Sequence, residues 1–259
     1  MNRENALSGR VALVTGVSRR RGIGFAIARE LSTLGADLFL HSFVAYDAAQ
    51  SWGMDPGGAM ALVSELRQSG RRVEYADTDL EPPDAPESLV RSATTAFGHI
   101  DILILNHAHS ALGGLEELTA DQIDRHFHVN VRASLLLAKA FAAQHDGRPG
   151  GRIVLLTSGQ HLAPMPGELA YAASKGALHQ VTRSLSAHLA SRHITVNTIN
   201  PGATETGYAS PRLYEEVLAL EPQGRWGDPA DAARIIGWVV TDSAQWITGE
   251  VINSTGGGP

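Results

Sequence analysis

Short β-type runs alternate with helical segments along the whole of this 259-residue chain. Such alternation favours a parallel sheet with helices on both faces, because each strand needs a crossover helix before the next strand can run beside it. The expected strands are 11–15, 37–41, 73–76, 101–105, 153–157, 195–199 and 250–253. The expected helices are about 23–34, 58–69, 85–97, 119–144, 168–191 and 229–240. The sequence therefore predicts an α/β fold with a doubly wound, mostly parallel sheet of seven strands.

The composition is that of an ordinary globular protein, with 43% hydrophobic and 19% charged residues and a formal net charge of -6. No linker divides the chain, so one domain over 1–259 is expected. A net acidic chain lacks the basic face that binds nucleic acid, and no apolar stretch is long enough to span a membrane. The absence of cysteine excludes disulfides and thiolate zinc sites. Residues 1–10 lack the apolar core of a signal peptide, so a cytoplasmic protein is expected.

The first expected strand leads into a glycine-rich turn, and an amphipathic helix follows at once. Glycines allow a tight turn and let a pyrophosphate approach the backbone, while the helix N-terminus offers free N–H groups to the anion. This arrangement predicts a dinucleotide site of the kind found in Rossmann folds. The residues expected to bind the cofactor here are Gly16, Ser18, Arg19, Arg20, Arg21, Gly22, Ile23 and Gly24.

The end of the second strand indicates which dinucleotide binds. Sites for NAD usually place an acid there, but Leu40-His41-Ser42-Phe43 contains no carboxylate. Guanidinium groups suit a 2′-phosphate, and three consecutive arginines stand in the glycine turn. We therefore expect NADP(H) rather than NAD, with Ser42 among its contacts. Since three adjacent side chains cannot all face one phosphate, one or two of the arginines could instead form a solvated charge run.

A tyrosine and a lysine with helical spacing indicate the chemistry. Lys175 is one of only two lysines in the chain and stands four residues after Tyr171, so the two share a helix face. A nearby ammonium favours the phenolate and lowers the pKa of a tyrosine, which would let Tyr171 transfer protons near pH 7. Ser158, 13 residues upstream, ends a buried strand on the edge where such sheets bind ligands. The alternative is a chance pair on an amphipathic helix.

Two irregular stretches, 43–57 and 202–224, follow strand ends on the expected ligand side. The second is expected to form a substrate lid, the alternative being a plain surface connection. Metal binding is not expected of the pairs His107/His109 and His126/His128, whose spacing matches no usual ligand pattern. One histidine of the first pair could meet substrate. The side chains expected to line the pocket are Gln160, His161 and Met165.

Together these motifs resemble the short-chain dehydrogenase/reductase family over nearly the whole chain. The family's Thr-Gly-x-x-x-Gly-x-Gly motif matches Thr15 to Gly24, with two extra residues between its first two glycines. The fourth strand ends Leu105-Asn106-His107-Ala108, where the family commonly has Asn-Asn-Ala-Gly. The resemblance implies catalytic roles for Asn130, Ser158, Tyr171 and Lys175. It implies cofactor contacts at Asp79, Leu80, Asn106, Tyr171, Lys175, Pro201, Gly202, Thr204 and Thr206.

The resemblance implies hydride transfer between a nicotinamide and a carbonyl or alcohol carbon. Tyr171 would give its proton to the developing alkoxide, Ser158 would bind the same oxygen, and Lys175 would lower the tyrosine pKa and hold the ribose. Asn130 would support a water that relays protons to Lys175. Enoyl-thioester reductases of this superfamily share the extended glycine loop but usually have six residues between tyrosine and lysine, where this chain has three. The resemblance also implies a homotetramer.

We therefore expect an NADP(H)-dependent oxidoreductase acting on a small ketone, such as a 3-oxoacyl thioester. Two other interpretations stay open. One is an NAD(P)-dependent alcohol or sugar dehydrogenase working in the oxidative direction. The other is a non-catalytic protein that senses NADPH, although a complete set of catalytic residues argues against it.

Overall fold

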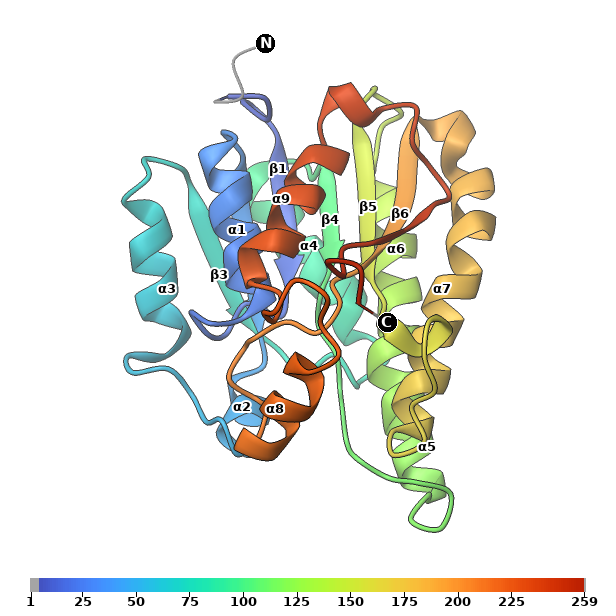
Figure 1. Ribbon diagram of the computed structural model, residues 1–259. Coiled ribbons are helices and arrows are strands. Elements are labelled where there is room, and N and C mark those ends of the chain that lie inside the picture. Colours follow the sequence, from blue (N-terminus) through green and yellow to red (C-terminus); the bar gives the residue numbers. More distant parts are fainter. Residues whose placement is uncertain (1–4, 259) are drawn as a thin grey trace.

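The computed structural model describes residues 5–258, and within this range the strands form a seven-stranded parallel sheet in the order β3-β2-β1-β4-β5-β6-β7 (Figure 1). The strands are β1 Val11–Thr15, β2 Asp37–Ser42, β3 Val73–Asp77, β4 Ile102–Leu105, β5 Gly151–Leu156, β6 Ile194–Asn200 and β7 Val251–Asn253. Strands β1, β4 and β5 are buried along their entire length, as expected for the centre of a parallel sheet covered on both faces. The predicted fold class is confirmed.

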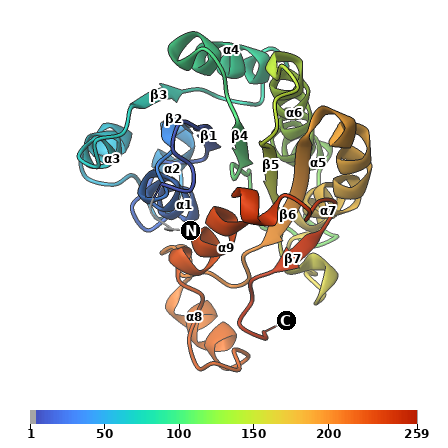
Figure 2. The same ribbon diagram turned by 90° about the horizontal axis from the view of Figure 1, so that it is seen from above.

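Helices cover both faces of the sheet, as the view in Figure 2 shows. On one face lie α1 Ile23–Thr33, α3 Gly58–Arg67 and α9 Pro229–Val239, and on the other lie α4 Ala85–Phe97, α6 Ala133–Gln144 and α7 Leu169–Leu189. Successive residues of β1 point to opposite faces. Val14 therefore packs with α1, α3 and α9 in one apolar cluster, while Leu13 packs with α4, α6 and α7 in a second cluster. The core is thus two apolar layers separated by the sheet.

Short elements appear where the sequence showed no periodicity. Helix α2, Val44–Ala48, lies in the first irregular stretch, and α8, Pro211–Leu218, lies in the second. The expected helix 119–144 is three elements: α5 Ala120–His126, a π-helix Phe127–Arg132, and α6. Among the described residues, no helix is long and apolar enough to cross a membrane.

The strand order places the ligand edge. The chain moves outward from β1 to β2 and β3, then returns to β4 on the other side of β1. At this reversal, crossover connections leave β1 and β4 in opposite directions, and a crevice forms beyond the carboxyl ends of the strands. The glycine turn after β1 and the loop after β4 meet there, as do the segments after β5 and β6.

Candidate functional site

The glycine turn is built for close backbone contact. Gly16 has φ +74°, and a Cβ at this position would lie 2.8 Å from the side-chain Nδ2 of Asn106. That Asn106 nitrogen donates to the carbonyls of Thr15 and Gly16, both at 3.0 Å, which holds the turn against the end of β4. Helix α1 begins after Gly22 with no side-chain cap and no acid in its first turn. Its N-terminus therefore presents N–H groups to an anion.

A buried histidine, His41, supports the glycine turn and was not among the predicted site residues. His41 is 1% exposed at the end of β2. Its Nε2 donates to the Thr78 carbonyl at 2.8 Å, and its Nδ1 accepts the Gly16 N–H at 3.4 Å. Burial lowers the pKa of His41 to about 4, so the ring is neutral and can accept this N–H. The sequence feature that could have identified His41 is its position as a polar residue within an otherwise apolar strand.

The end of β2 does have a carboxylate beside it, supplied by the neighbouring strand. Asp77 of β3 is in register with Ser42, whose hydroxyl donates to Asp77 Oδ1 at 3.3 Å. The same carboxylate oxygen accepts the Val44 N–H at 2.8 Å. Residues 40–43 themselves contain no carboxylate, as the sequence shows, but local sequence did not reveal this neighbouring acid because it does not show which strand pairs with β2. Asp79 and Leu80 were predicted as cofactor contacts. Leu80 is buried, and Asp79 accepts the Glu81 N–H at 2.8 Å.

Each of the three arginines in the glycine turn has an acidic partner. Arg20 binds Glu65 through two nitrogens, at 2.8 and 3.0 Å, and points away from the sheet edge toward α3. Arg21 binds Glu205 at 2.9 Å.

Arg19 is the best enclosed of the three. Its Nε lies 3.4 Å from Asp47, its guanidinium lies over the Trp52 ring, and its Nη1 donates to the Thr206 carbonyl at 2.9 Å. Arg19 and Arg21 thus connect the glycine turn to residues 205–206, while Arg20 is bound to α3; the side chains of Arg20 and Arg21, 44% and 66% exposed, are both solvated.

Ser158, Tyr171 and Lys175 come together at the end of β5. Lys175 is 2% exposed; its Nζ donates to the Leu156 carbonyl at 2.8 Å and lies 5.6 Å from the Tyr171 ring centroid. The Thr157 hydroxyl donates to the Lys175 carbonyl at 2.9 Å, which fixes α7 against the strand end. The predicted pairing of tyrosine and lysine on one helix face is present in the structure.

The expected lowering of the Tyr171 pKa is wrong for the protein in this structure. Burial raises the pKa of the phenol above its ordinary value and the charge of Glu168 raises it further, while the Ser158 hydroxyl acts in the opposite direction. Burial also lowers the pKa of Lys175 to about 8. Removal from water disfavours both charged forms, and this outweighs the attraction that the sequence spacing suggested.

Asn130 is fully buried inside the π-helix, where it connects three segments. Its Oδ1 accepts the His109 N–H at 2.7 Å. Its Nδ2 donates to the His109 carbonyl and to the Ser174 hydroxyl, both at 2.9 Å. The side-chain amide therefore holds the loop after β4 against α7, one residue before Lys175.

Two of the histidines near this loop, His107 and His126, hold neighbouring segments through hydrogen bonds of their rings. His107 bonds to the Thr15 hydroxyl through Nδ1 at 2.8 Å and donates from Nε2 to the Val129 carbonyl at 3.1 Å. His126 accepts the Ala111 N–H, and its ring lies between those of His109 and Tyr171, with centroid distances of 4.6 and 6.4 Å. Within the part of the chain that the structure describes, no group of three or more His, Cys, Asp or Glu side chains could hold a metal ion.

The segment after β6 carries the last group of predicted cofactor residues. Gly202 has φ +67° and donates its N–H to Asn200 Oδ1 at 3.0 Å. The buried Thr204 hydroxyl donates back to the Pro201 carbonyl at 3.1 Å. Thr206 is held through its carbonyl by Arg19. These bonds give the first residues after the strand a fixed turn.

Residues 202–224 are organised around Trp226, which is 4% exposed. Its ring stacks on Tyr214 of α8 at a centroid distance of 5.2 Å and meets Tyr208 edge-on at 6.0 Å. Its Nε1 donates to the Tyr214 carbonyl at 3.0 Å. The predicted irregular connection is therefore a packed unit with its own short helix.

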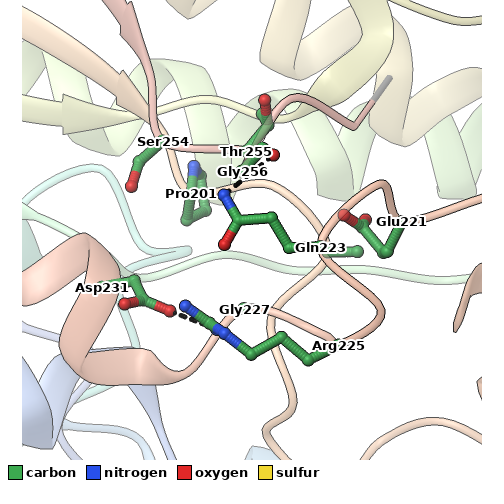
Figure 3. Close-up of a pocket in the computed structure, with 10 residues that line it drawn as sticks. Pro201, Glu221, Gln223, Arg225, Gly227, Asp231, Ser254, Thr255 and Gly256 are labelled. Atoms are coloured by element: carbon green, nitrogen blue, oxygen red, sulfur yellow. Dashed lines mark hydrogen bonds and ion pairs between the residues drawn. The ribbon is translucent and has the colours of Figure 1, made fainter.

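A cavity of about 230 Å³ opens where this segment meets the C-terminal residues (Figure 3). Gln223 donates to the Gly256 carbonyl at 3.0 Å, and Arg225 binds Asp231 at 2.7 Å along its wall. Pro201 lines this cavity, whereas Ser158, Tyr171 and Lys175 do not. The cavity is thus next to the expected cofactor contacts and separate from the tyrosine and lysine.

Comparison with known proteins agrees with this geometry. A family model described as enoyl-(acyl carrier protein) reductase matches residues 16–258. The uncharacterized oxidoreductase YjdA of Bacillus subtilis (strain 168) is 39% identical over 250 residues, which are 96% of each chain. A short chain dehydrogenase from Burkholderia cenocepacia J2315 in complex with NADP has a TM-score of 0.87 and 33% identity, covering 98% of this chain and 99% of that one. The angucycline C-6 ketoreductase LanV with bound NADP has a TM-score of 0.86 and 33% identity, covering 98% and 96%.

Proposed function

The chain belongs to the short-chain dehydrogenase/reductase family, and we propose that this oxidoreductase uses NADPH to reduce a ketone. The observation that carries the proposal is the position of Tyr171. It lies beside Ser158 and Lys175 at the carboxyl end of β5, on the edge that also carries the glycine turn. This position supports a role for Tyr171 as proton donor beside a dinucleotide bound at the glycine turn.

A nicotinamide dinucleotide fits the residues present. The glycine turn is packed so closely that a Cβ at Gly16 or Gly24 would clash with the Asn106 side chain, which keeps the turn tight, and the uncapped start of α1 suits a pyrophosphate. By the resemblance, Pro201 and Thr206 would contact the nicotinamide half, and Asn106 is a further expected cofactor contact. When bound, the cofactor supplies the hydride.

The preference for NADP(H) is supported by Arg19 and Arg21 and by the NADP bound in two similar structures. Asp77 acts against it, because a carboxylate beside Ser42 would repel a 2′-phosphate and could accept a ribose hydroxyl. We propose that the two arginines outweigh this single, exposed carboxylate.

The protein's own residues manage the proton. Because the pKa of Tyr171 is raised, its phenol is protonated at neutral pH, the form needed to donate to an alkoxide. Ser158 would hydrogen-bond the same substrate oxygen. Lys175 is charged below about pH 8 and would hold ribose hydroxyls and stabilise the phenolate left after proton donation. Both N–H groups of the Asn130 amide are used by His109 and Ser174, so a supporting water would have to donate to the free acceptor site of its Oδ1 or of its main-chain carbonyl, each of which accepts one bond already.

The substrate side is bounded by the loop after Ser158 and by the segment 202–224, which we propose as the lid. A 3-oxoacyl thioester is one small ketone that such a site could take. A second candidate, reduction of an enoyl thioester, is favoured by the family model that matches residues 16–258. The three residues between Tyr171 and Lys175 favour the ketone. A homotetramer stays a prediction from the resemblance, and a cytoplasmic location stays a prediction from the sequence of residues 1–10.

The test is NADPH oxidation with acetoacetyl and crotonyl thioesters, beside NADH and beside Tyr171→Phe. We expect the ketone to be turned over and the variant to lose at least a hundredfold in kcat, because a positioned proton donor contributes about that factor or more. The NADPH Kd of the variant should match that of the wild type. Normal turnover in Tyr171→Phe, or turnover of the enoyl thioester alone, would overturn the proposal.

A further inference from the structure

Glu168 is fixed at the entrance to the helix that carries Tyr171 and Lys175. It is the last residue before α7 and pairs with Gly113 of the loop after β4 in a short parallel bridge. The Gly113 N–H donates to the Gly167 carbonyl at 2.7 Å, and the Leu169 N–H donates to the Gly113 carbonyl at 3.2 Å. The backbone on both sides of Glu168 is therefore held, and its side chain starts from a defined point.

The Glu168 carboxylate is half-buried, yet within residues 5–258 it has no hydrogen-bond or ion-pair partner. Nearby acids differ in this respect: Glu117 accepts the Gly114 N–H, and Glu205 binds Arg21. Burial raises the pKa of Glu168. A carboxylate that loses water without gaining a partner is unfavourable in the folded protein, which is typical of a group kept for a ligand.

Two tyrosines show which way this carboxylate faces. Glu168 is the N-cap residue of α7 and Tyr171 is the third residue of that helix, two positions whose side chains are neighbours at a helix start. Its charge raises the pKa of Tyr171 and also that of Tyr208, which comes from the segment 202–224. The carboxylate therefore stands at the start of the helix that carries the proposed proton donor, beside the loop after β4, and its charge also reaches Tyr208 of the proposed lid.

We propose that Glu168 is a specificity-determining residue that accepts a hydrogen bond from a hydroxyl group of the substrate, so that the preferred substrates are hydroxy ketones. This inference rests on the proposed ketone reduction and names its substrate class. An ionised carboxylate can only accept, so the substrate must donate. A neutral hydroxyl fits better than an ammonium, because Lys175 already places a cation beside Tyr171. A 3-oxoacyl group has no such donor beside its ketone.

The experiment compares three ketones that differ only in a hydroxyl: 2-butanone, 1-hydroxy-2-butanone and 4-hydroxy-2-butanone. NADPH oxidation gives kcat/KM for each with the wild type, Glu168→Gln and the matched control Glu87→Gln, whose side chain is exposed on α4. We expect the wild type and the control to prefer at least one hydroxy ketone over 2-butanone by tenfold or more. Glu168→Gln should lose most of that preference, because a hydrogen bond to a charged group is worth more than one to an amide.

A pH profile adds a readout that a structural role would not move. Removing the Glu168 charge should lower the pKa of Tyr171, so the loss of activity that reports Tyr171 ionisation, which lies above the limb near pH 8 that reports Lys175, should begin at lower pH in Glu168→Gln. If that variant does not fold, the wild type alone still tests the proposal. Its hydroxyl preference should decline as acid protonates Glu168, and a preference unchanged by acid would overturn the inference.

The possible failures are distinguishable. Turnover of 2-butanone that depends on Tyr171, with no hydroxyl preference or with the same preference in Glu168→Gln, would overturn the role of Glu168 and leave ketone reduction standing. Tight NADPH binding with no turnover of any of the three ketones or of the acetoacetyl thioester would overturn the proposed function itself.

Discussion

Replacing Asn130 with alanine should destabilise the folded protein by about 2–4 kcal/mol. The side chain is 0% exposed and makes three hydrogen bonds, two of them to the backbone of His109. Alanine would leave the His109 N–H and C=O without these partners, and an unsatisfied buried group costs about 1–3 kcal/mol. For a chain of this size the change corresponds to a Tm lower by roughly 5–15 °C.

Urea unfolding without cofactor measures this loss independently of activity. Ser174→Ala removes the third bond of Asn130 and the bond from the Ser174 hydroxyl to the Tyr171 carbonyl but leaves the His109 contacts, and it should cost about 1–2 kcal/mol. Ser92→Ala, on the exposed side of α4, serves as the control and should change little. If Asn130→Ala were no more destabilising than Ser174→Ala, the His109 contacts would not hold the loop, and the structural role given to this amide would be wrong.

Two further predictions concern the cofactor end. Arg19→Ala should lower kcat/KM for NADPH by about tenfold or more, because a charged hydrogen bond to the 2′-phosphate is lost, and it should lower kcat/KM for NADH much less. The matched control is Arg20→Ala, because Arg20 binds Glu65 instead. Equal losses with both cofactors would remove Arg19 from 2′-phosphate recognition. His41 binds its proton below about pH 4 in the folded protein but below about 6.5 when unfolded, so it lowers stability progressively as the pH falls through that window. His41→Asn should flatten this part of the urea-unfolding pH profile, and an unchanged profile would show that His41 titrates normally.

The sequence was sufficient for the elements with a strong pattern. Strands such as Val11–Thr15 and helices such as Ala85–Phe97 carry clear periodicity, and the turn between β1 and α1 has a local glycine signature. Helix α2, Val44–Ala48, is too short to show a period. The acid at the end of β2 could not be found from local sequence, because Asp77 reaches Ser42 only through the pairing of β2 with β3.

The sequence spacing predicted that Ser158, Tyr171 and Lys175 lie together, but it did not predict the pKa values of these groups. Tyr171, Lys175 and Ser158 follow from position along the chain, because a helix and a strand end place them. The pKa of Tyr171 depends on how much water its surroundings exclude, which is a property of packing across several segments. The unpaired state of Glu168 is likewise visible only once its neighbours are known.

The π-helix Phe127–Arg132 changes the rotational phase of the long helix that it interrupts. Each residue advances an α-helix by about 100°, so one extra residue in a turn rotates everything beyond it by that angle. Asn130 can therefore face the loop after β4 while Leu137 and Phe141 of α6 still face the apolar core. Deleting a single residue from this turn would restore a regular helix and turn either the amide or the core residues away from their partners. The wide turn uncouples the two faces, so that substitutions in the loop contact and in the core can accumulate independently.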